Sequence, residues 1–301
     1  MKSAQLILIF CFTRLSSTRI ATELDSIMVL QLRCIGFCGV DDSVDPLLLS
    51  IISTHYQWVE WGILFRQDKE GQPRYPSTTW VQKLVEAKVN TQQIRIAAHL
   101  CGGRCQELLR GEYGFIERLH NDGFQRIQIN ATRANDVIVD VAHLTDIITN
   151  LKNAILAFPT IEWIIQCNNE TAPIKESLEK IHSILPNMSF LFDASCGTGV
   201  NMSVRPLPPI HATIPCGYAG GLGPETLTDT LSLLSSHLSA ADHPSPPPPP
   251  IWVDMESSLR EHLLAAPAAA AGGAETRDVF SIRRCFQCIR TAADLLQLPY
   301  T

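Results

Sequence analysis

The most informative stretch of this sequence is Cys216-Gly217-Tyr218-Ala219-Gly220-Gly221-Leu222-Gly223-Pro224-Glu225. Its first four residues are small or apolar and fit the end of a buried strand, and Gly220 and Gly221 then remove two side chains at a turn. Gly223 suits a helix N-cap, Pro224 the first helical position, and Glu225 the positive end of the helix dipole. A junction of this kind either offers free backbone N–H groups to an anion or is a tight turn that binds nothing.

On both sides of this junction, strand-like and helical patterns alternate along the chain. Apolar runs predict strands at Leu32–Phe37, Val59–Phe65, Ile94–Leu100, Arg126–Asn130, Ile161–Gln166, Ser189–Asp193, Cys216–Ala219 and Ile251–Asp254. Helical periodicity predicts helices at Pro46–Ser53, Ser77–Ala87, Phe115–Asn121, Val141–Ala157, Ile174–Ile184, Glu225–Leu238 and Val279–Ala293.

Eight strands that alternate with helices predict an α/β protein, a single-domain (β/α)8 TIM barrel with surface insertions. The alternative is an open, doubly wound sheet, which normally carries G-x-G-x-x-G after its first strand. Gly36-Phe37-Cys38-Gly39 does not match that fingerprint. The barrel is therefore the preferred fold.

Composition narrows the classes of function. The chain has 301 residues, 46% of them hydrophobic, which is enough for a sizeable core. A formal net charge of −6 argues against a nucleic-acid partner, and no apolar run is long enough to span a membrane. Ten cysteines in a chain of this length are typical of reduced thiols, so we expect a cytoplasmic protein. Neither Cys101/Cys105 nor Cys285/Cys288 has a second pair at zinc-ribbon distance, and no metal site is predicted.

Three segments are expected to lie apart from the packed barrel. Residues 1–28 form a leader or a disordered extension, because a short apolar run is followed by arginines and serines with no acid before Glu23. A real leader would make the protein organellar or secretory. The barrel is then residues 29–301, with insertions near 243–250 and 265–275. The five prolines that end the first insertion favour polyproline II, as a passive loop or as a ligand for an SH3- or WW-type binding module.

Polar residues stand at the predicted carboxyl ends of the strands, where barrel enzymes place their chemistry. Cys38 follows the first strand and His99 lies at the end of the third. Each residue could also be structural: Cys38 as a small hydrophobic core residue and His99 as a hydrogen-bonded core histidine. Asp193 directly follows Phe190-Leu191-Phe192, and a buried carboxylate must be hydrogen-bonded, paired or functional. Asp254 ends the eighth strand and could also cap a short helix.

In chain order, the motifs at these ends are Cys38-Gly39-Val40, Arg74-Tyr75, Gln128-Ile129-Asn130, Phe192-Asp193, Gly197-Thr198-Gly199, Ala219–Glu225 and Val253–Ser258. This order resembles phosphoribosylanthranilate isomerase, the Amadori-rearranging barrel of tryptophan synthesis, from about Arg33 to Arg260. The resemblance implies an isomerase of a small phosphosugar that uses no cofactor. Asn130-Ala131 stands where the family usually has His-Gly.

The resemblance also implies roles for individual residues. Asp193 is the expected general acid, and Cys38, as a thiolate, the expected general base. Four residues are expected to bind the substrate, with Arg74 on a carboxylate: Arg74, Gln128, Asn130 and Gly199. The expected phosphate site consists of Gly220, Gly221, Glu256, Ser257 and Ser258, and Arg260 is expected to offset the charge of Glu256.

Two other functions fit the same residues. One is a related barrel enzyme that acts on a different sugar phosphate with the same anion site. The other is a catalytically inactive barrel that serves as a binding protein. The joint presence of Cys38 and Asp193 favours an enzyme.

Overall fold

A computed structural model describes residues 30–91, 93–193, 195, 211–240, 248–264, 276–296 and 298. The predicted leader, Gly199 and the insertion at 265–275 lie outside these residues, as does most of the insertion at 243–250. In the described part of the chain, no helix combines the length and the apolar character that crossing a bilayer requires.

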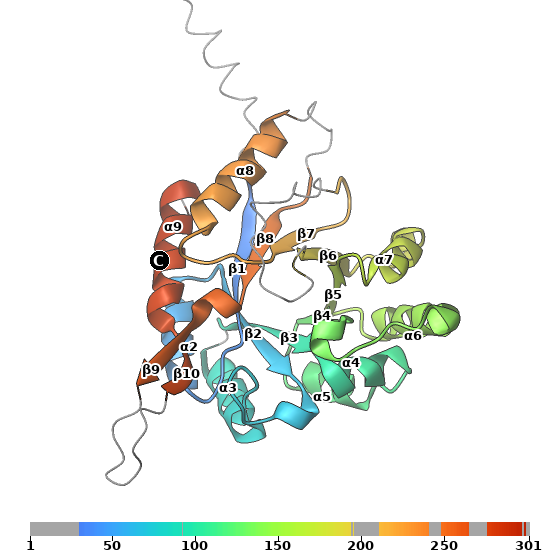
Figure 1. The fold of residues 1–301 in the computed structure, drawn as a ribbon, viewed down its shortest axis with the longest axis horizontal. Helices are drawn as coiled ribbons and strands as arrows, with labels where there is room; N and C mark the ends of the chain where they lie inside the picture. Colours follow the sequence, from blue (N-terminus) through green and yellow to red (C-terminus); the bar gives the residue numbers. More distant parts are fainter. Residues whose placement is uncertain are drawn as a thin grey trace, which may run out of the picture.

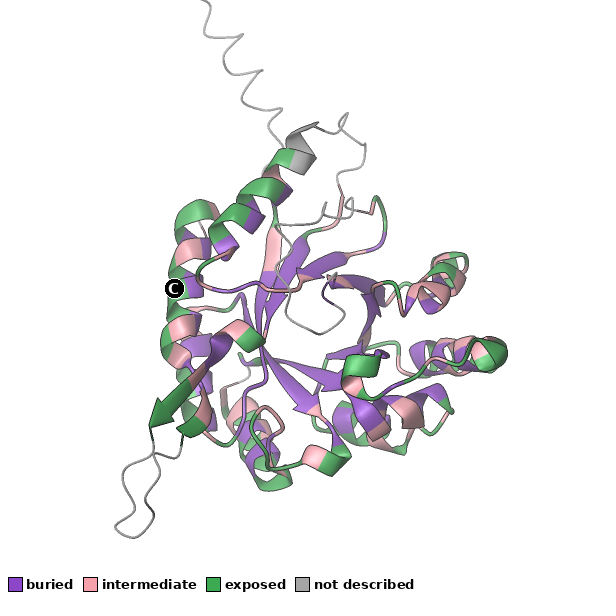
Figure 2. Cartoon of the chain, in the orientation of Figure 1, coloured by how far each residue is buried: buried purple, intermediate pink, exposed green. Residues whose placement is uncertain are grey.

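The central element is a closed barrel of eight parallel strands, which confirms the predicted fold (Figure 1). Each strand pairs with the next in sequence, and the last pairs with the first. The strands are β1 (Leu32–Cys38), β2 (Val59–Phe65), β3 (Arg95–Leu100), β4 (Arg126–Ile129), β5 (Glu162–Cys167), β6 (Met188–Asp193), β7 (Cys216–Ala219) and β8 (Ile251–Met255). Every strand is buried over most of its length (Figure 2).

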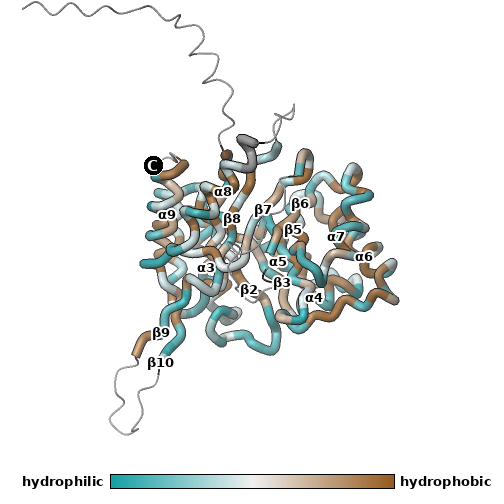
Figure 3. The backbone as a smooth tube through the Cα atoms, turned by 45° about the horizontal axis from the view of Figure 1, so that its top comes forward, coloured by the Kyte–Doolittle hydropathy of each residue, from teal (hydrophilic) through white to brown (hydrophobic). Residues whose placement is uncertain are grey.

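Helices surround the barrel: α2 (Pro46–His55), α3 (Thr78–Thr91), α4 (Gly102–Leu109), α5 (Gly114–Asn121), α6 (Leu144–Ala157), α7 (Ala172–Glu179), α8 (Leu227–Ala240) and α9 (Ile282–Leu296). Sequence signals set several of their ends. Asp45 caps α2 by accepting a hydrogen bond from the N–H of Leu47, and Pro46 occupies the first turn. In Figure 3, brown segments, which mark hydrophobic residues, run along β5 and β8 near the centre of the molecule.

Three helix predictions were wrong in detail. Helix α4 was missed; it begins at Gly102-Gly103, and glycine has a low intrinsic helix propensity. Helix α8 begins at Leu227 rather than Glu225, since the chain from Gly223 first forms a turn in which the Gly223 carbonyl accepts from the N–H groups of Thr226 and Leu227.

The third error concerns the start of the last helix, predicted at Val279. Residues Thr276–Phe280 instead form strand β10, which pairs antiparallel with β9 (Arg260–Leu264). This hairpin projects from the barrel at the lower left of Figure 1. Its five-residue ladder overrides the helical pattern, and α9 begins only at Ile282.

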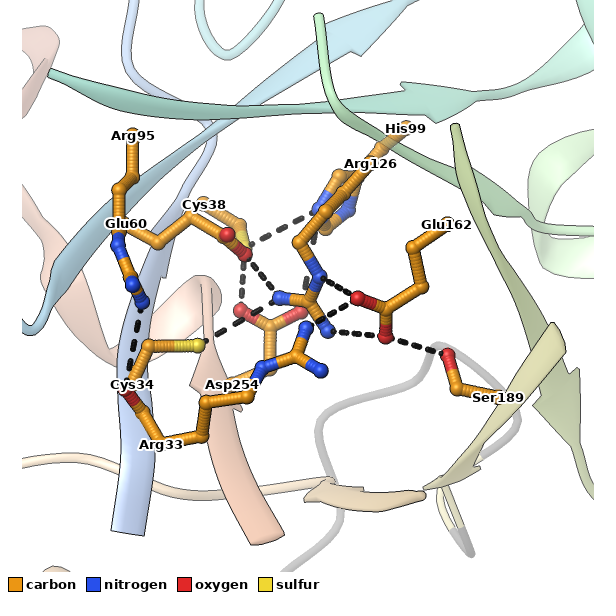
Figure 4. Close-up of polar contacts among 10 residues, drawn as sticks. All are labelled: Arg33, Cys34, Cys38, Glu60, Arg95, His99, Arg126, Glu162, Ser189 and Asp254. Carbon is orange, nitrogen blue, oxygen red and sulfur yellow. Dashed lines mark hydrogen bonds and ion pairs between the residues drawn. The ribbon is translucent and has the colours of Figure 1, made fainter. Parts of the chain in front are cut away.

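Charged side chains occupy the barrel interior near the amino-terminal ends of the strands. The guanidinium of Arg126 bonds Glu60 and lies 3.2 Å from both carboxylate oxygens of Glu162 (Figure 4). It also lies over the ring of Trp252, 4.5 Å from the centroid, and Ser189 donates to Glu162. The indole of Trp252 in turn occupies the space that a side chain on Gly217 would need. Arg126 thus links the buried Glu60 to the half-buried Glu162, which also pairs with Arg33.

Replacing Arg126 with Met should lower the free energy of unfolding by about 3–5 kcal/mol, because buried Glu60 would lose the ion-pair partner that the structure gives it, while the half-buried Glu162 would keep Arg33. Chemical denaturation measures this loss. The matched control is Arg110→Met, at an exposed arginine that pairs with Glu112, and it should leave stability nearly unchanged. A similar small effect of both substitutions would contradict the account of the barrel interior.

Candidate active site

A cavity of about 340 Å³ opens at the carboxyl ends of β1, β6, β7 and β8. It brings together most of the residues that the sequence singled out: Cys38, Asp193, Gly220, Gly221, Glu256, Ser257 and Ser258. Asp254, Ser195, Ala219, Leu222 and Met255 complete its lining. A larger cavity of about 500 Å³ is lined mainly by α3 and α5 and holds none of the predicted site residues. We therefore take the smaller cavity as the candidate active site.

Cys38, His99 and Asp254 meet at the floor of this cavity (Figure 4). The Sγ of Cys38 donates a hydrogen bond of 2.6 Å to Oδ1 of Asp254 and lies 3.6 Å from Nε2 of His99. That nitrogen is 3.9 Å from Oδ2 of Asp254. The three residues are only 1%, 4% and 7% exposed. The sequence had marked His99 and Asp254 as polar strand ends without assigning them to the site.

Two glycines make room for this group. A Cβ at Gly62 of β2 would collide with the sulfur of Cys38, and a Cβ at Gly36 of β1 would collide with the carboxylate of Asp254. Gly36 is the register partner of Asp254 across β1 and β8, and Gly62 is the partner of Cys38 across β1 and β2. Both glycines are therefore required by the close approach of a neighbouring side chain.

Burial controls the protonation of the three groups. Desolvation, reinforced by the negative charge of Asp254, raises the pKa of the Cys38 thiol well above its usual value. Desolvation also raises the pKa of Asp254 to about 7, opposed by the hydrogen bond from Cys38. Desolvation and the charge of Arg126 lower the pKa of His99 to about 3, so the imidazole is neutral. The expectation that Cys38 is a thiolate was wrong, because the structure makes it a protonated donor.

Asp193 lines the opposite part of the cavity, at the end of β6. Its Oδ2 accepts a hydrogen bond of 2.8 Å from Nε2 of Gln166. Its Oδ1 accepts from the backbone N–H and the hydroxyl of Ser195, at 3.0 and 2.5 Å. The carboxylate is thus oriented by three donors, and it fixes the first turn after β6.

Gln128 and Asn130 do not line the cavity. Nε2 of Gln128 donates to Oδ1 of Asn130 at 2.7 Å, and Nδ2 of Asn130 contacts the sulfur of Cys101 at 3.4 Å. Oε1 of Gln128 is buried and has no hydrogen-bond partner among the described residues. The structure therefore pairs these two amides with each other and does not bring them to the cavity wall, in contrast to the substrate contacts expected from the sequence.

Arg74 lies beside the cavity but is not free to bind a carboxylate. Its Nη1 is 3.0 Å from Oε1 of Glu256 and 3.4 Å from the hydroxyl of Ser257. Its backbone is held in the left-handed region, at φ 77°, where its N–H donates to Asp41. Burial raises the pKa of Glu256, and the nearby Arg74 charge opposes that rise. Arg74 is thus matched with Glu256 of the protein through Nη1, and its expected contact with a substrate carboxylate stays a prediction.

Arg260 was expected to offset the charge of Glu256. Its guanidinium is instead committed to three other groups, at 2.8 Å from Asp41, 2.9 Å from Asp278 and 2.9 Å from the carbonyl of Gly39. These contacts anchor the β9–β10 hairpin to the loop after β1. The ion-pair partner of Glu256 is Arg74, and the charge of Arg260 acts on Glu256 only from a distance, where it helps to oppose the rise in the pKa of Glu256.

The glycine junction after β7 forms one wall of the cavity. Gly220 and Gly221 have φ values of 101° and 67°, which favour glycine. Ser258 donates to the carbonyl of Leu222, and a Cβ at Gly223 would collide with Ser258. The loop after β7 therefore packs directly against the short 3₁₀ helix Ser257–Leu259 after β8, as the predicted phosphate site requires.

No protein-family model matches the sequence, and no curated protein matches it. Among solved structures, the chain is similar to a sialic acid synthetase from Leptospira borgpetersenii serovar Hardjo-bovis, with 12% identity, coverage of 75% and 73% of the two chains and a TM-score of 0.43. A putative lyase/mutase from Burkholderia cenocepacia J2315 gives 14% identity, 89% and 82% coverage and a TM-score of 0.37.

A Rubisco-like protein from Rhodopseudomonas palustris gives 10% identity and a TM-score of 0.38. The match covers 74% of this chain but spans only 60% of that protein. At these TM-scores the matches carry no argument about activity or substrate. The function must be argued from the cavity itself.

The close packing around Cys38 gives a direct test. Gly62→Ala should lower the free energy of unfolding by about 1–3 kcal/mol, because the new methyl group must displace the sulfur of Cys38 or shift β2. The control is Gly114→Ala at the start of α5, where no atom lies within 4 Å of the added carbon and stability should be unchanged or raised. Equal stability of the two variants would show that Cys38 is not held as described.

Proposed function

We propose that this cavity catalyses an aldose-to-ketose rearrangement of a phosphorylated N-glycoside, as the resemblance to phosphoribosylanthranilate isomerase implies. The observation that carries the proposal is that two proton-transfer centres line a single cavity. Cys38 with Asp254 comes from β1 and β8, and Asp193 comes from β6. An Amadori rearrangement needs an acid at the ring oxygen and a base at C2′, and the cavity supplies both.

In the first step, Asp193 acts in its protonated form and donates that proton to the ribose ring oxygen, which leaves the Asp193 carboxylate. The bond between that oxygen and C1′ breaks, and the nitrogen lone pair forms a C1′=N Schiff base. Gln166 and Ser195 hold the carboxylate in place during this transfer. Orientation by fixed donors lets the acid act without reorganising its surroundings.

In the second step, the C2′ proton passes to the sulfur of Cys38 while the thiol proton moves to Oδ1 of Asp254, over the existing 2.6 Å hydrogen bond. The electron pair of the C2′–H bond forms the C1′=C2′ double bond of an enolamine, and the π pair of the C1′=N bond returns to the nitrogen as its lone pair. The enolamine then takes a proton at C1′ and loses the proton of its C2′ hydroxyl, which gives the ketone. This relay needs no free thiolate, because Asp254 is the final proton acceptor.

The proposed phosphate site is the wall formed by Gly220, Gly221 and Ser257. Glu256 stands next to it and would repel an anion, but its ion pair with Arg74 reduces that repulsion. The pair also bears on the choice of substrate. Since Arg74 is already matched with a carboxylate of the protein, a second candidate is a related phosphosugar isomerisation whose substrate carries no carboxylate at this position.

Turnover of phosphoribosylanthranilate tests the acid–base assignment. Cys38→Ser and Asp193→Asn should each lower kcat by about 10²- to 10⁴-fold, since each removes one proton-transfer group. The control is Cys216→Ser, which should leave kcat nearly unchanged. A serine at this position keeps the hydrogen bond that the thiol donates to the carbonyl of Ile214. Melting curves of all variants separate lost catalysis from lost stability.

Near-wild-type turnover in Cys38→Ser would remove Cys38 from the mechanism. A parallel loss of stability and of phosphosugar affinity in Asp193→Asn would identify Asp193 as an anchor of the loop rather than the acid. Growth of a tryptophan auxotroph that lacks the isomerase, rescued by this chain, would select phosphoribosylanthranilate over the related phosphosugars.

Ligand-induced stabilisation tests the phosphate wall. Millimolar ribose 5-phosphate should raise the melting temperature of the wild type, by linkage of binding to the folded state. Ser257→Asp should abolish the shift, because it adds a negative charge at an exposed position on that wall. The control Thr145→Asp adds the same charge on α6 and should keep the shift. No shift in the wild type would sink the phosphate assignment.

A further inference from the structure

Three potential metal ligands converge at the floor of the cavity from three different strands. They are the sulfur of Cys38 on β1, Nε2 of His99 on β3 and the carboxylate of Asp254 on β8 (Figure 4). These ligand atoms all lie within 4.8 Å of one another, and all three residues are buried. We propose that Cys38, His99 and Asp254 form a binding site for a thiophilic divalent cation of the Zn²⁺ class.

The distances suit a tetrahedral centre. Zn²⁺ binds sulfur at about 2.3 Å and imidazole nitrogen at about 2.0–2.1 Å, so a tetrahedral site holds these two atoms roughly 3.6 Å apart. Sγ of Cys38 and Nε2 of His99 are 3.6 Å apart. Zn²⁺ binds a carboxylate oxygen at about 2.0–2.2 Å, so a tetrahedral site holds that oxygen about 3.3 Å from the imidazole nitrogen. In the structure, Nε2 lies 3.9 Å from Oδ2 of Asp254. The carboxylate needs only a small rotation to complete the site.

One contact must change when a cation binds. The hydrogen bond from Cys38 to Asp254, at 2.6 Å, is shorter than the spacing of two ligands on one metal. Metal binding replaces the S–H bond with an S–metal bond and releases one proton to solvent. With that proton gone, the sulfur and the carboxylate oxygen separate to ligand spacing on either side of the ion.

Carboxylates and two arginines shape the charge around the proposed ligands. Asp193, Asp254 and Glu256 line the cavity, Glu256 is paired with Arg74, and the charge of Arg126 acts on His99 and Asp254. The mixed ligand set of sulfur, nitrogen and oxygen selects a thiophilic ion over Mg²⁺ or Ca²⁺, which prefer oxygen alone. Since Cys38 and Asp254 line the cavity, the fourth coordination position faces it, and water or a ligand oxygen can fill that position.

Occupancy has a consequence that rests on the proposed function. Cys38 carries the C2′ proton in that proposal, and a metal-bound sulfur can no longer pass its proton to Asp254. Zn²⁺ would therefore inhibit the rearrangement by holding the base. Metal binding and inhibition of turnover are measured independently, so one of them can be disproved while the other stands.

The test is titration of the chelator-treated full chain with Co²⁺, followed by displacement with Zn²⁺. We expect one Co²⁺ per chain, with the d–d absorption of a four-coordinate ion and a thiolate-to-cobalt charge-transfer band. Cys38→Ser should remove that band, and His99→Gln and Asp254→Asn should each weaken binding by about tenfold or more, because even partners of metal ligands are worth about 10- to 100-fold. Cys216→Ser, at a buried thiol away from the cluster, should bind as the wild type does.

A second measurement uses only the wild-type chain, in case a variant fails to fold. Zn²⁺ should slow alkylation of Cys38, located by peptide mass, at least about tenfold, and should leave Cys216 unprotected. A charge-transfer band that survives in Cys38→Ser, or Zn²⁺ that does not protect Cys38, would overturn the site. If Zn²⁺ binds at Cys38 but turnover is unaffected, the metal site stands and the proposed role of Cys38 in catalysis fails.

Discussion

The hydrogen bond between the thiol of Cys38 and the carboxylate of Asp254 is the interaction on which the account of this molecule depends. Both groups are buried at the floor of the cavity, where an unpaired polar group costs several kcal/mol, on the order of 2–7. The hydrogen bond satisfies both groups, because the thiol donates to the carboxylate oxygen at 2.6 Å. Burial, reinforced by the charge and the hydrogen bond of Asp254, raises the pKa of the thiol, and in the proposed mechanism the same hydrogen bond carries the proton to Asp254.

Other features of the barrel support this contact. Gly36 and Gly62 stand on the strands at the positions where any side chain would separate the pair. Below it, Arg126 balances the buried charges of Glu60 and Glu162, so that the interior carries polar groups along its length without an uncompensated ion there. Above it, the glycine junction after β7 and the 3₁₀ helix after β8 form one wall of the cavity and are joined by the hydrogen bond from Ser258 to the carbonyl of Leu222. One interior therefore holds ion pairs that stabilise the barrel at the amino ends of the strands and the candidate active site at their carboxyl ends.

The sequence predicted the eight strands to within one residue at either end, because each is a buried run between turn signals. It also predicted that Cys38, Asp193 and the glycine junction share one rim, since barrel topology alone requires this. The sequence could not predict contacts that depend on the register between neighbouring strands or on the approach of distant loops. Asp254 meets Cys38 because Asp254 is the register partner of Gly36, and Arg74 meets Glu256 although 182 positions separate them. The hairpin was missed because its strand β10 merges with the helical pattern of α9.

The central claim is that this cavity moves a proton from C2′ and delivers one to C1′ of a phosphorylated N-glycoside. The most direct measurement is the NMR spectrum of phosphoribosylanthranilate incubated with the protein in D₂O. The account predicts a ketose product that carries solvent-derived deuterium at C1′, because the enolamine is protonated there. An N-glycoside that remains unchanged, with no ketose formed and no deuterium at C1′, would contradict it.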